Sequence, residues 1–282
     1  MAARNGYAFP TGADAAEQFD ALQTVLDPLT TARLTELGIA PGARCWEAGA
    51  GGGSIARWLA DRVGPAGLVV ATDRDTSQLR PSGNLHVDRH DLREHSVPDG
   101  GPFDLVHARL VLLHLPQRRE ILHRLIAATK PGGWLLIEEF DCTVTPHVLH
   151  APSADDAELF RRYVDTLVGV LAAAGADLAW ARHVHAAMTE ASLHNVHTIG
   201  HAESWTGGGP GCQLHETNSI QMRPELLATG LAPDDLRRLR DLLRHPGFAA
   251  MSYQFVSTRG RKPLATEVQP GSPGAVRAGG DR

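Results

Sequence analysis

The sequence is poor in cysteine and has no long run of apolar residues. Its three cysteines, Cys45, Cys142 and Cys212, are scattered and form no CxxC motif. Such a set builds no disulfide framework and suits a reducing compartment, so we expect a cytoplasmic protein. The most apolar stretch, residues 167–176, stops at Asp177 and is much shorter than a membrane-spanning helix. These absences argue against a disulfide-rich secreted scaffold and against a membrane protein.

The sequence also lacks an excess of positive charge and an apolar N-terminal segment. Lys and Arg number 27 against 32 Asp and Glu, which gives a net charge of -5. Because nucleic-acid binding depends on clustered cations, we expect no nucleic-acid partner. The arginines within residues 237–244 alternate with aspartates, which is typical of a solvated helix face. Asp14 and Glu17 interrupt the region where a signal peptide carries its apolar core, so none is expected.

The remaining composition is that of a folded globular chain. The sequence has 282 residues, of which 43% are hydrophobic, enough to bury a substantial core. Residues 1–6 are mostly small or polar, and residues 264–282 are rich in Gly, Pro and Ala without an aromatic residue. Because these ends bury too little apolar surface to offset their ordering entropy, we expect both to be disordered.

Strand-like and helix-like segments alternate between the two ends. Strand patterns cover residues 44–48, 67–72, 85–87, 103–108 and 134–138, and helix patterns cover residues 54–63 and 116–128. A helical spacing over residues 15–37 is broken near Pro28. The alternation indicates βαβ units, whose right-handed crossovers place helices on both faces of a parallel sheet. We therefore expect an N-terminal helical cap at residues 7–41 and an α/β core at residues 42–141.

The pattern changes after Asp141. Helix patterns cover residues 153–174, 180–192 and 234–243, and strand patterns cover residues 196–205 and 248–257. We predict a doubly wound α/β sheet with a helical insertion, acting as a lid, at residues 142–195. The core then resumes at residues 196–263, so the insertion separates its fifth and sixth strands.

A glycine-rich loop follows the first predicted strand. It reads Glu47-Ala48-Gly49-Ala50-Gly51-Gly52-Gly53 and leads into a helix. Glycines allow a positive φ and a close approach to a ligand, and the helix N-terminus behind them offers free N–H groups. Asp73 comes 20 residues after Gly53, where a carboxylate can accept both hydroxyls of a ribose. The unit is predicted to bind a nucleoside.

Two nucleoside ligands compete for this loop. A dinucleotide such as NAD brings a pyrophosphate, but the GxGxxG fingerprint fails at Ser54. Glu47 would also repel the phosphates at close range. S-adenosylmethionine (SAM) has no phosphate and carries an ammonium and a sulfonium, which Glu47 would attract. The spacing therefore favours SAM.

Further segments in a fixed order carry a resemblance to a known family. They are CWEAGAGGG (45–53), VVATD (69–73), HDL (90–92), FDLVHARLVLLHLP (103–116) and KPGGWLLIEE (130–139). Residues 42–141 resemble a class I SAM-dependent methyltransferase, with the greatest similarity to ubiquinone-methyltransferase-like enzymes of small-molecule metabolism. The resemblance extends to residues 26–30 and 256–263. It implies a seven-stranded Rossmann-like sheet whose last strand is antiparallel.

The resemblance also implies residue roles in cofactor binding. It assigns SAM contacts to Gln18, Glu47, Gly49, Ala50, Gly51, Gly53, Asp73, Arg74, Asp91, Leu92, Ala108 and Arg109. The glycines would line the methionine part, and Glu47 would receive the ammonium. Asp73 would bind the ribose, and Asp91 would accept from the adenine amino group. Gln18 stands where relatives often have an arginine that faces the SAM carboxylate, so it keeps a hydrogen bond and loses the charge.

The acceptor side is expected beyond the carboxyl ends of the strands. Candidate catalytic residues are Arg109, nearest the sulfonium, and His114, a possible base. The predicted acceptor contacts are Tyr7, Phe140, Asp141, Tyr163 and Trp205. The reaction implied is an in-line displacement on the methyl carbon, which needs alignment and water exclusion.

Several alternatives remain open from the sequence. The histidine spacings at residues 183–185 and 194–201 resemble ligand sets, but no cysteine or carboxylate cluster completes them, so no metal is expected. A non-catalytic SAM-binding protein and an NAD(P)-dependent oxidoreductase are the rival functions, and a homodimer is an open possibility. The sequence identifies neither the small-molecule acceptor nor the atom that is methylated.

Overall fold

The computed structural model describes Phe9 and residues 16–264 of the chain. The predicted disordered ends therefore lie outside the described residues, apart from Leu264, and so does Tyr7. No helix among the described residues is long and apolar enough to cross a membrane.

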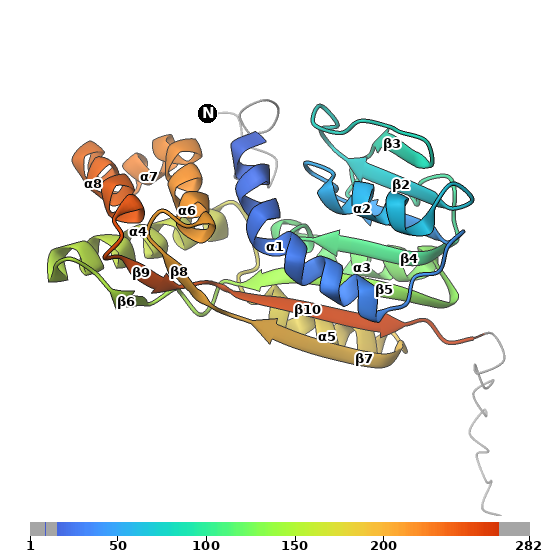
Figure 1. The fold of residues 1–282 in the computed structure, drawn as a ribbon. Helices are drawn as coiled ribbons and strands as arrows, with labels where there is room; N and C mark the ends of the chain where they lie inside the picture. Colours follow the sequence, from blue (N-terminus) through green and yellow to red (C-terminus); the bar gives the residue numbers. More distant parts are fainter. Residues whose placement is uncertain (1–8, 10–15, 265–282) are drawn as a thin grey trace, which may run out of the picture.

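A seven-stranded sheet forms the centre of the molecule, with the strand order β3-β2-β1-β4-β5-β10-β7 (Figure 1). The strands are β1 (Arg44–Ala48), β2 (Leu68–Asp73), β3 (Leu85–Arg89), β4 (Phe103–Arg109), β5 (Thr129–Asp141), β7 (His194–His201) and β10 (Gln254–Arg261). Strands β1 to β5 pair in parallel, and β10 is antiparallel to both β5 and β7. The predicted doubly wound sheet with an antiparallel last strand is confirmed.

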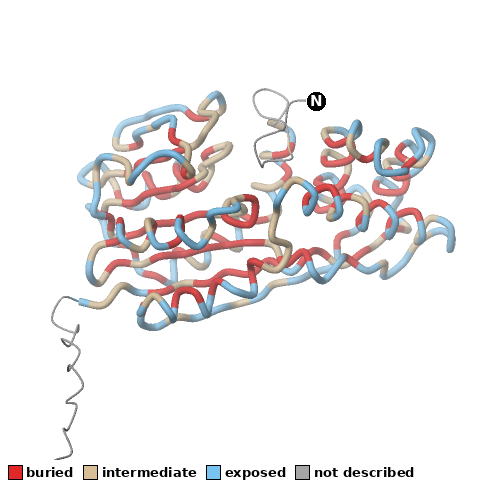
Figure 2. The backbone as a smooth tube through the Cα atoms, turned by 180° about the vertical axis from the view of Figure 1, so that it is seen from behind, coloured by how far each residue is buried: buried red, intermediate tan, exposed pale blue. Residues whose placement is uncertain are grey.

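Helices cover both faces of this sheet. They are α1 (Ala16–Glu36) and α2 (Ser54–Val63) on one face, and α3 (Arg118–Ala128) and α5 (Trp180–Glu190) on the other. Cys45 and Val69 pack in the core beneath α2, whereas their neighbours Trp46 and Val70 pack in the core beneath α3 and α5. Successive strand side chains point to opposite faces, so each strand feeds both cores. Figure 2 shows that the central strands are buried along most of their length.

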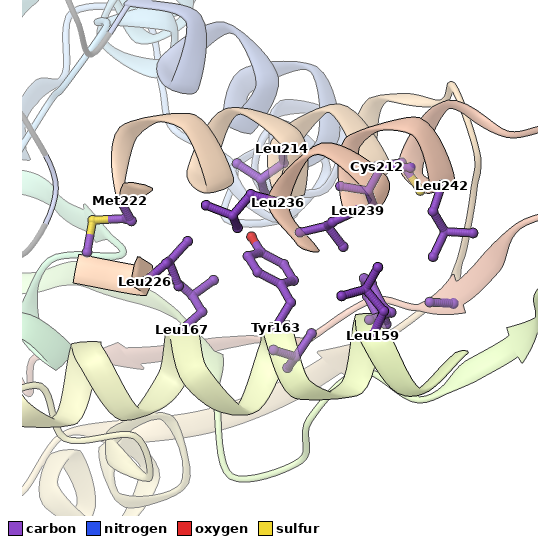
Figure 3. Close-up of a cluster of buried hydrophobic side chains, with 14 of the residues drawn as sticks. Leu159, Tyr163, Leu167, Cys212, Leu214, Met222, Leu226, Leu236, Leu239 and Leu242 are labelled. Carbon is purple, nitrogen blue, oxygen red and sulfur yellow. The ribbon is translucent and has the colours of Figure 1, made fainter. Parts of the chain in front are cut away.

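A second lobe lies beyond the carboxyl ends of the parallel strands (Figure 1). It contains α4 (Ala154–Ala173), α6 (Pro210–Gln221), α7 (Arg223–Ala228) and α8 (Pro233–Arg244), with a small sheet of β6 (Val148–His150), β9 (Ala249–Met251) and β8 (Ser204–Thr206). Leucines from α4, α6, α7 and α8 meet around Tyr163 in one apolar core (Figure 3).

The lobe is assembled differently from the predicted insertion. Helix α4 belongs to it, but α5 packs against β5, β7 and β10 of the main sheet, because Trp180, Val184 and Met188 join the sheet's core. Helices α6 to α8 instead come from the segment between β7 and β10. Two separate insertions therefore build the lobe, where a single insertion at residues 142–195 was expected.

The helix at the N-terminus also differs from its prediction. Helix α1 continues through Pro28, near which the pattern predicted a break, and it bends along its length (Figure 1). Proline removes one backbone donor and kinks a helix, but packing can hold the two halves together. Leu26, Thr30 and Leu34 are all buried, so the same face of the helix stays against the protein on both sides of the proline.

Candidate functional site

A cavity lies at the carboxyl ends of β1, β2 and β4, between the sheet, α1 and the second lobe. Of the predicted site residues, Gln18, Glu47, Gly49, Ala50, Gly51, Asp73, Arg74, Asp91, Leu92, Arg109, His114 and Phe140 line it. The fold therefore brings most of the predicted residues to one place, although they span more than a hundred positions of the sequence.

The glycine loop is fixed against β2 by backbone hydrogen bonds. The N–H groups of Gly49 and Ala50 both donate to the carbonyl of Thr72, at 2.8 and 2.9 Å. Gly49 has φ +77°, and a Cβ there would meet Cγ2 of Val111 at 2.4 Å. Because only glycine tolerates both this backbone and this approach, the loop can lie close beside the cavity.

Glu47 lines the cavity from the end of β1 and is buried. Its Oε2 lies 2.7 Å from Nδ1 of His107, and Nε2 of His107 lies 3.2 Å from Oε2 of Glu138. Burial lowers the pKa of His107, but the charge of Glu47 and the bonds to both carboxylates outweigh it and raise the pKa to about 9. At neutral pH His107 is therefore an imidazolium between two carboxylates.

Asp73, at the end of β2, holds the glycine loop. Its Oδ2 accepts from the N–H of Gly51 at 2.9 Å, and its Oδ1 accepts from the N–H of Asp75 at 3.0 Å. Burial raises the pKa of Asp73, and these backbone bonds oppose the rise. Each carboxylate oxygen keeps a further lone pair, so the side chain can anchor the loop and still accept from a ligand hydroxyl.

Asp91 forms a bidentate ion pair with Arg93. Nε of Arg93 donates to Oδ1 at 3.0 Å, and Nη2 donates to Oδ2 at 2.6 Å. These hydrogen bonds hold the pKa of the Asp91 carboxyl below its usual range. Asp91 stays ionised, and any ligand amino group that it accepts from must share its oxygens with Arg93.

Helix α1 closes one side of the cavity through three side-chain hydrogen bonds. Nε2 of Gln18 donates to Oδ1 of Asn218 at 2.8 Å, which joins α1 to α6. Arg109, at the end of β4, donates to Oδ1 of Asp27 at 2.9 Å and to Oγ1 of Thr30 at 3.0 Å. Arg109 lines the cavity as predicted, but its guanidinium is engaged by α1.

His114 ends a short 3₁₀ helix, η2 (Leu112–His114), at the rim of the cavity. Oε1 of Glu139 accepts from the N–H groups of Leu112 and Leu113, at 2.8 and 3.2 Å, and so holds this turn. Burial lowers the pKa of His114 to about 4, so its ring is neutral at neutral pH. Phe9 meets this ring edge-on, with 6.3 Å between ring centroids.

The cavity is apolar on the side of the second lobe. Phe140 lies near the carboxyl end of β5, Leu167 and Leu171 come from α4, and Leu214 comes from α6. Tyr253 lies 5.5 Å from the ring of Phe140, and its buried hydroxyl has no hydrogen-bond partner among the described residues. This end therefore offers aliphatic and aromatic surface together with one unsatisfied hydroxyl.

Five predicted residues lie away from the cavity lining. Gly53 precedes α2 with φ 74°, and Ala108 is fully buried inside the sheet. Asp141 is also buried and binds Nε of Arg182 at 2.6 Å. Tyr163 donates to the carbonyl of His215 at 2.9 Å within the core of the second lobe (Figure 3), and Trp205 packs against the His215 ring. Tyr7 lies outside the described residues.

The sequence interpretation missed His107, Glu138 and Tyr253. His107 lies inside the segment 103–116 that carries the resemblance, but no role was assigned to it. Its contact with Glu47 depends on the strand order of the sheet: the two residues lie near the ends of β1 and β4, which the structure pairs directly in register. Tyr253 had no comparable signal, since it reaches the cavity from a turn before β10.

No group of three His, Cys, Asp or Glu residues within the described part of the chain is arranged to hold a metal ion. The histidines at positions 183, 185, 194 and 197, whose spacing resembled a ligand set, are exposed. They lie on α5 and the edge strand β7, away from the cavity lining.

Comparison with curated proteins finds methyltransferases among the relatives of this chain. Methyltransferase str3 from Strobilurus tenacellus is 32% identical over 142 residues, which cover 50% of each chain. The ubiquinone/menaquinone biosynthesis C-methyltransferase UbiE of Ectopseudomonas mendocina (strain ymp) is 31% identical over 113 residues, or 36% of this chain and 44% of that one. The chain spans about half the length of the curated relatives it matches.

Solved structures share the fold at low sequence identity. Phosphoethanolamine N-methyltransferase 2 from Haemonchus contortus, in complex with phosphomonomethylethanolamine and S-adenosylhomocysteine, has a TM-score of 0.52 at 17% identity. The match covers 89% of this chain and 58% of that one. The YcgJ protein of Bacillus subtilis has a TM-score of 0.52 at 12% identity, with 83% and 98% covered.

A family model described as a methyltransferase domain matches residues 20–203, well over half of the chain. This range begins in α1 and ends just after β7, so it includes the glycine loop, Asp73, Asp91 and the turn that carries His114. The chain therefore belongs to the methyltransferase-domain family.

Proposed function

We propose that the protein is a SAM-dependent methyltransferase that acts on a small, largely apolar acceptor. The observation that carries this proposal is a single cavity with two chemically different ends. One end holds the glycine loop and the carboxylates of Glu47, Asp73 and Asp91, and the other holds the apolar residues of β5, α4 and α6.

The acidic end fits SAM better than it fits a dinucleotide. Glu47 lines the cavity at the glycine loop, where a dinucleotide would bring its pyrophosphate. A carboxylate this close to a pyrophosphate would repel it, whereas it attracts the cations of SAM. The bound cofactor supplies a methyl group already activated on a sulfonium, and the chain's own residues align it and exclude water.

The resemblance supplies the residue roles, and the place of each side chain in the cavity supports them. Glu47 binds the ammonium, and Asp73 accepts from the ribose while its backbone bonds keep the loop in place. Asp91 and Leu92 lie at the adenine, with Arg74 beside it. Gln18 donates to the methionyl carboxylate, and its bond to Asn218 brings α6 to the same ligand.

The apolar end supports an uncharged or weakly charged acceptor. Leu167, Leu171, Leu214 and Phe140 offer dispersion contacts to a flat or aliphatic molecule. The Arg109 guanidinium, which would be the natural partner of a phosphate, is paired with Asp27. A phosphorylated acceptor, such as the one bound in the Haemonchus contortus structure, therefore finds no unpaired cation at this end among the residues that the structure describes. A quinone-like or hydroxylated aromatic acceptor fits better, which agrees with the name of the UbiE relatives.

His114 is the proposed base for an acceptor that must lose a proton. Its ring lines the cavity and is neutral at neutral pH because burial lowers its pKa. A neutral imidazole carries a lone pair on one ring nitrogen, which can accept the proton that the nucleophile releases. Arg109 acts as a positioning residue, since its bonds to Asp27 and Thr30 hold α1 over the site.

A methyl-transfer assay with labelled SAM tests this proposal. The purified chain is incubated with hydroxylated aromatics and reduced quinones in one panel and with phosphoethanolamine in another. We expect label in an apolar product and none in the phosphorylated amine. Binding of S-adenosylhomocysteine without transfer to any acceptor would favour the non-catalytic SAM-binding alternative, and transfer to phosphoethanolamine alone would contradict the acceptor class.

A further inference from the structure

A charged cluster is buried beneath the acidic end of the cavity. His107 is fully buried on β4, between Glu47 at the end of β1 and Glu138 on β5. Each ring nitrogen faces a different carboxylate, at 2.7 Å for Glu47 and 3.2 Å for Glu138. Burying two carboxylates at this depth is costly unless both charges are compensated.

The geometry is satisfied only by a doubly protonated ring. A neutral imidazole has one N–H, so one of its nitrogens would turn a lone pair toward a carboxylate oxygen. An imidazolium donates to both carboxylates at once. Two carboxylates and one imidazolium leave the cluster with a single net negative charge, and Glu47 presents it to the cavity.

Glu138 is held more firmly than Glu47. Its Oε1 accepts from Ser257 of β10 at 2.6 Å, and its Oε2 accepts from Thr30 of α1 at 2.5 Å. His107 is therefore braced on its Glu138 side by two further elements of the fold. On its Glu47 side it holds Oε2 alone, and Glu47 has no second side-chain partner among the described residues.

We infer that His107 is a positioning residue for cofactor binding. Held by Glu138, it turns Glu47 so that the other carboxylate oxygen receives the ammonium of the methionyl group. This role rests on the proposed function, because it concerns the same SAM site. It does not involve the nucleoside part of the ligand, which other residues bind.

Two ligands separate this role from a merely structural one. S-adenosylhomocysteine carries the amino acid group, whereas 5′-methylthioadenosine has the same nucleoside and thioether without it. We expect His107→Gln to lower the affinity for S-adenosylhomocysteine by roughly ten-fold or more, because a charge-assisted hydrogen bond is lost. The affinity for 5′-methylthioadenosine should change by less than about two-fold.

Isothermal titration calorimetry measures both affinities, and two further variants complete this test. Glu138→Gln removes the charge that braces His107 while keeping its shape, and should give the same selective loss to a smaller extent. If circular dichroism shows that His107→Gln does not fold, Glu138→Gln tests the positioning role in its place. His215→Gln is the matched control, because His215 is also a buried histidine but has no carboxylate partner within the described part of the chain and does not line the cavity. It should leave both affinities unchanged.

The possible results are distinct. An unchanged affinity for S-adenosylhomocysteine in the folded variants, or an equal loss for both ligands, overturns the positioning role. Failure of the wild-type protein to bind S-adenosylhomocysteine at all would instead overturn the proposed function.

Discussion

Asp73 has two tasks at the residue scale, and they affect different measurements. Its oxygens accept from the N–H groups of Gly51 and Asp75, so the carboxylate stabilises the glycine loop without a ligand. The same oxygens are proposed to accept from the ribose. From the sequence alone, only the second task was predicted. Both the ligand affinity and the stability of the free protein should therefore depend on this side chain.

Replacing Asp73 with alanine removes both tasks. We expect Asp73→Ala to lower the affinity for S-adenosylhomocysteine by about ten-fold or more and to lower the unfolding temperature of the free protein. Asp73→Asn keeps one acceptor oxygen and should lower the unfolding temperature less. Calorimetry and thermal unfolding measure the two effects. Asp88→Ala, which removes an exposed carboxylate of β3, is the control, and an unaltered affinity in Asp73→Ala would refute the ribose assignment.

His114 carries the pH dependence expected for the reaction. A base acts in its deprotonated form, which predominates above its pKa of about 4. Activity should therefore persist as the pH falls from about 8 to about 5 and decline only nearer 4. An ordinary histidine would lose activity below about pH 6.5. The pH profile of kcat with a hydroxylated acceptor distinguishes the two cases.

Substitution of the same residue gives an independent result. His114→Gln should lower kcat by about 100-fold for an acceptor that must lose a proton, with little change in KM for SAM. His123→Gln, at an exposed position of α3, is the control. A kcat equal to that of the wild type would remove His114 from the mechanism.

The residue scale also shows where sequence reasoning stops. The position of Gly49, Glu47 and Asp73 at the cavity could be predicted, because the glycine motif and the acidic residue that ends the next strand have a characteristic spacing. His107 and Glu138 could not be assigned in this way, because their relation to Glu47 depends on which strands are neighbours in the sheet. Asp91 and Arg109 were predicted at the site, but the sequence did not indicate their partners Arg93 and Asp27.

At the scale of elements, hydrophobic periodicity predicted α4, α5 and α8 but not α6 or α7. Helix α6 buries polar residues, among them His215, Asn218 and Ser219, so its sequence shows no apolar stripe. Helix α7 spans six residues, too few for a periodic pattern. Pro28 had the opposite effect, since it predicted a break in the helix. The buried face of α1 continues past it.

Ligand-induced ordering is the prediction that belongs to this scale. Helices α1 and α6 both line the cavity and meet through Gln18 and Asn218, whereas α5 packs on the far side of the sheet. We expect S-adenosylhomocysteine to slow hydrogen exchange in residues 16–23 and in α6, and to leave α5 unchanged. Exchange measured with and without ligand tests this expectation. Equal slowing in α5, or no change in α1, would indicate that α1 and α6 do not close on the ligand.

At the scale of the whole molecule, the cavity joins parts of the chain with separate origins. The sheet supplies the proposed cofactor side, and the two insertions supply the proposed acceptor side. Their sequence positions suggested one lid, because the alternation of patterns indicates element types but not which elements pack together. Helix α5 is an example: it was predicted as part of the lid from its position in the sequence, whereas its apolar face completes the core of the main sheet.

The central claim is that this cavity takes SAM and not a dinucleotide, and one calorimetric comparison tests it most directly. The full chain is titrated with S-adenosylhomocysteine and, under the same conditions, with NAD. The position of Glu47 at the glycine loop predicts saturable binding of S-adenosylhomocysteine and no binding heat with NAD. Saturable binding of NAD without any for S-adenosylhomocysteine would contradict the account.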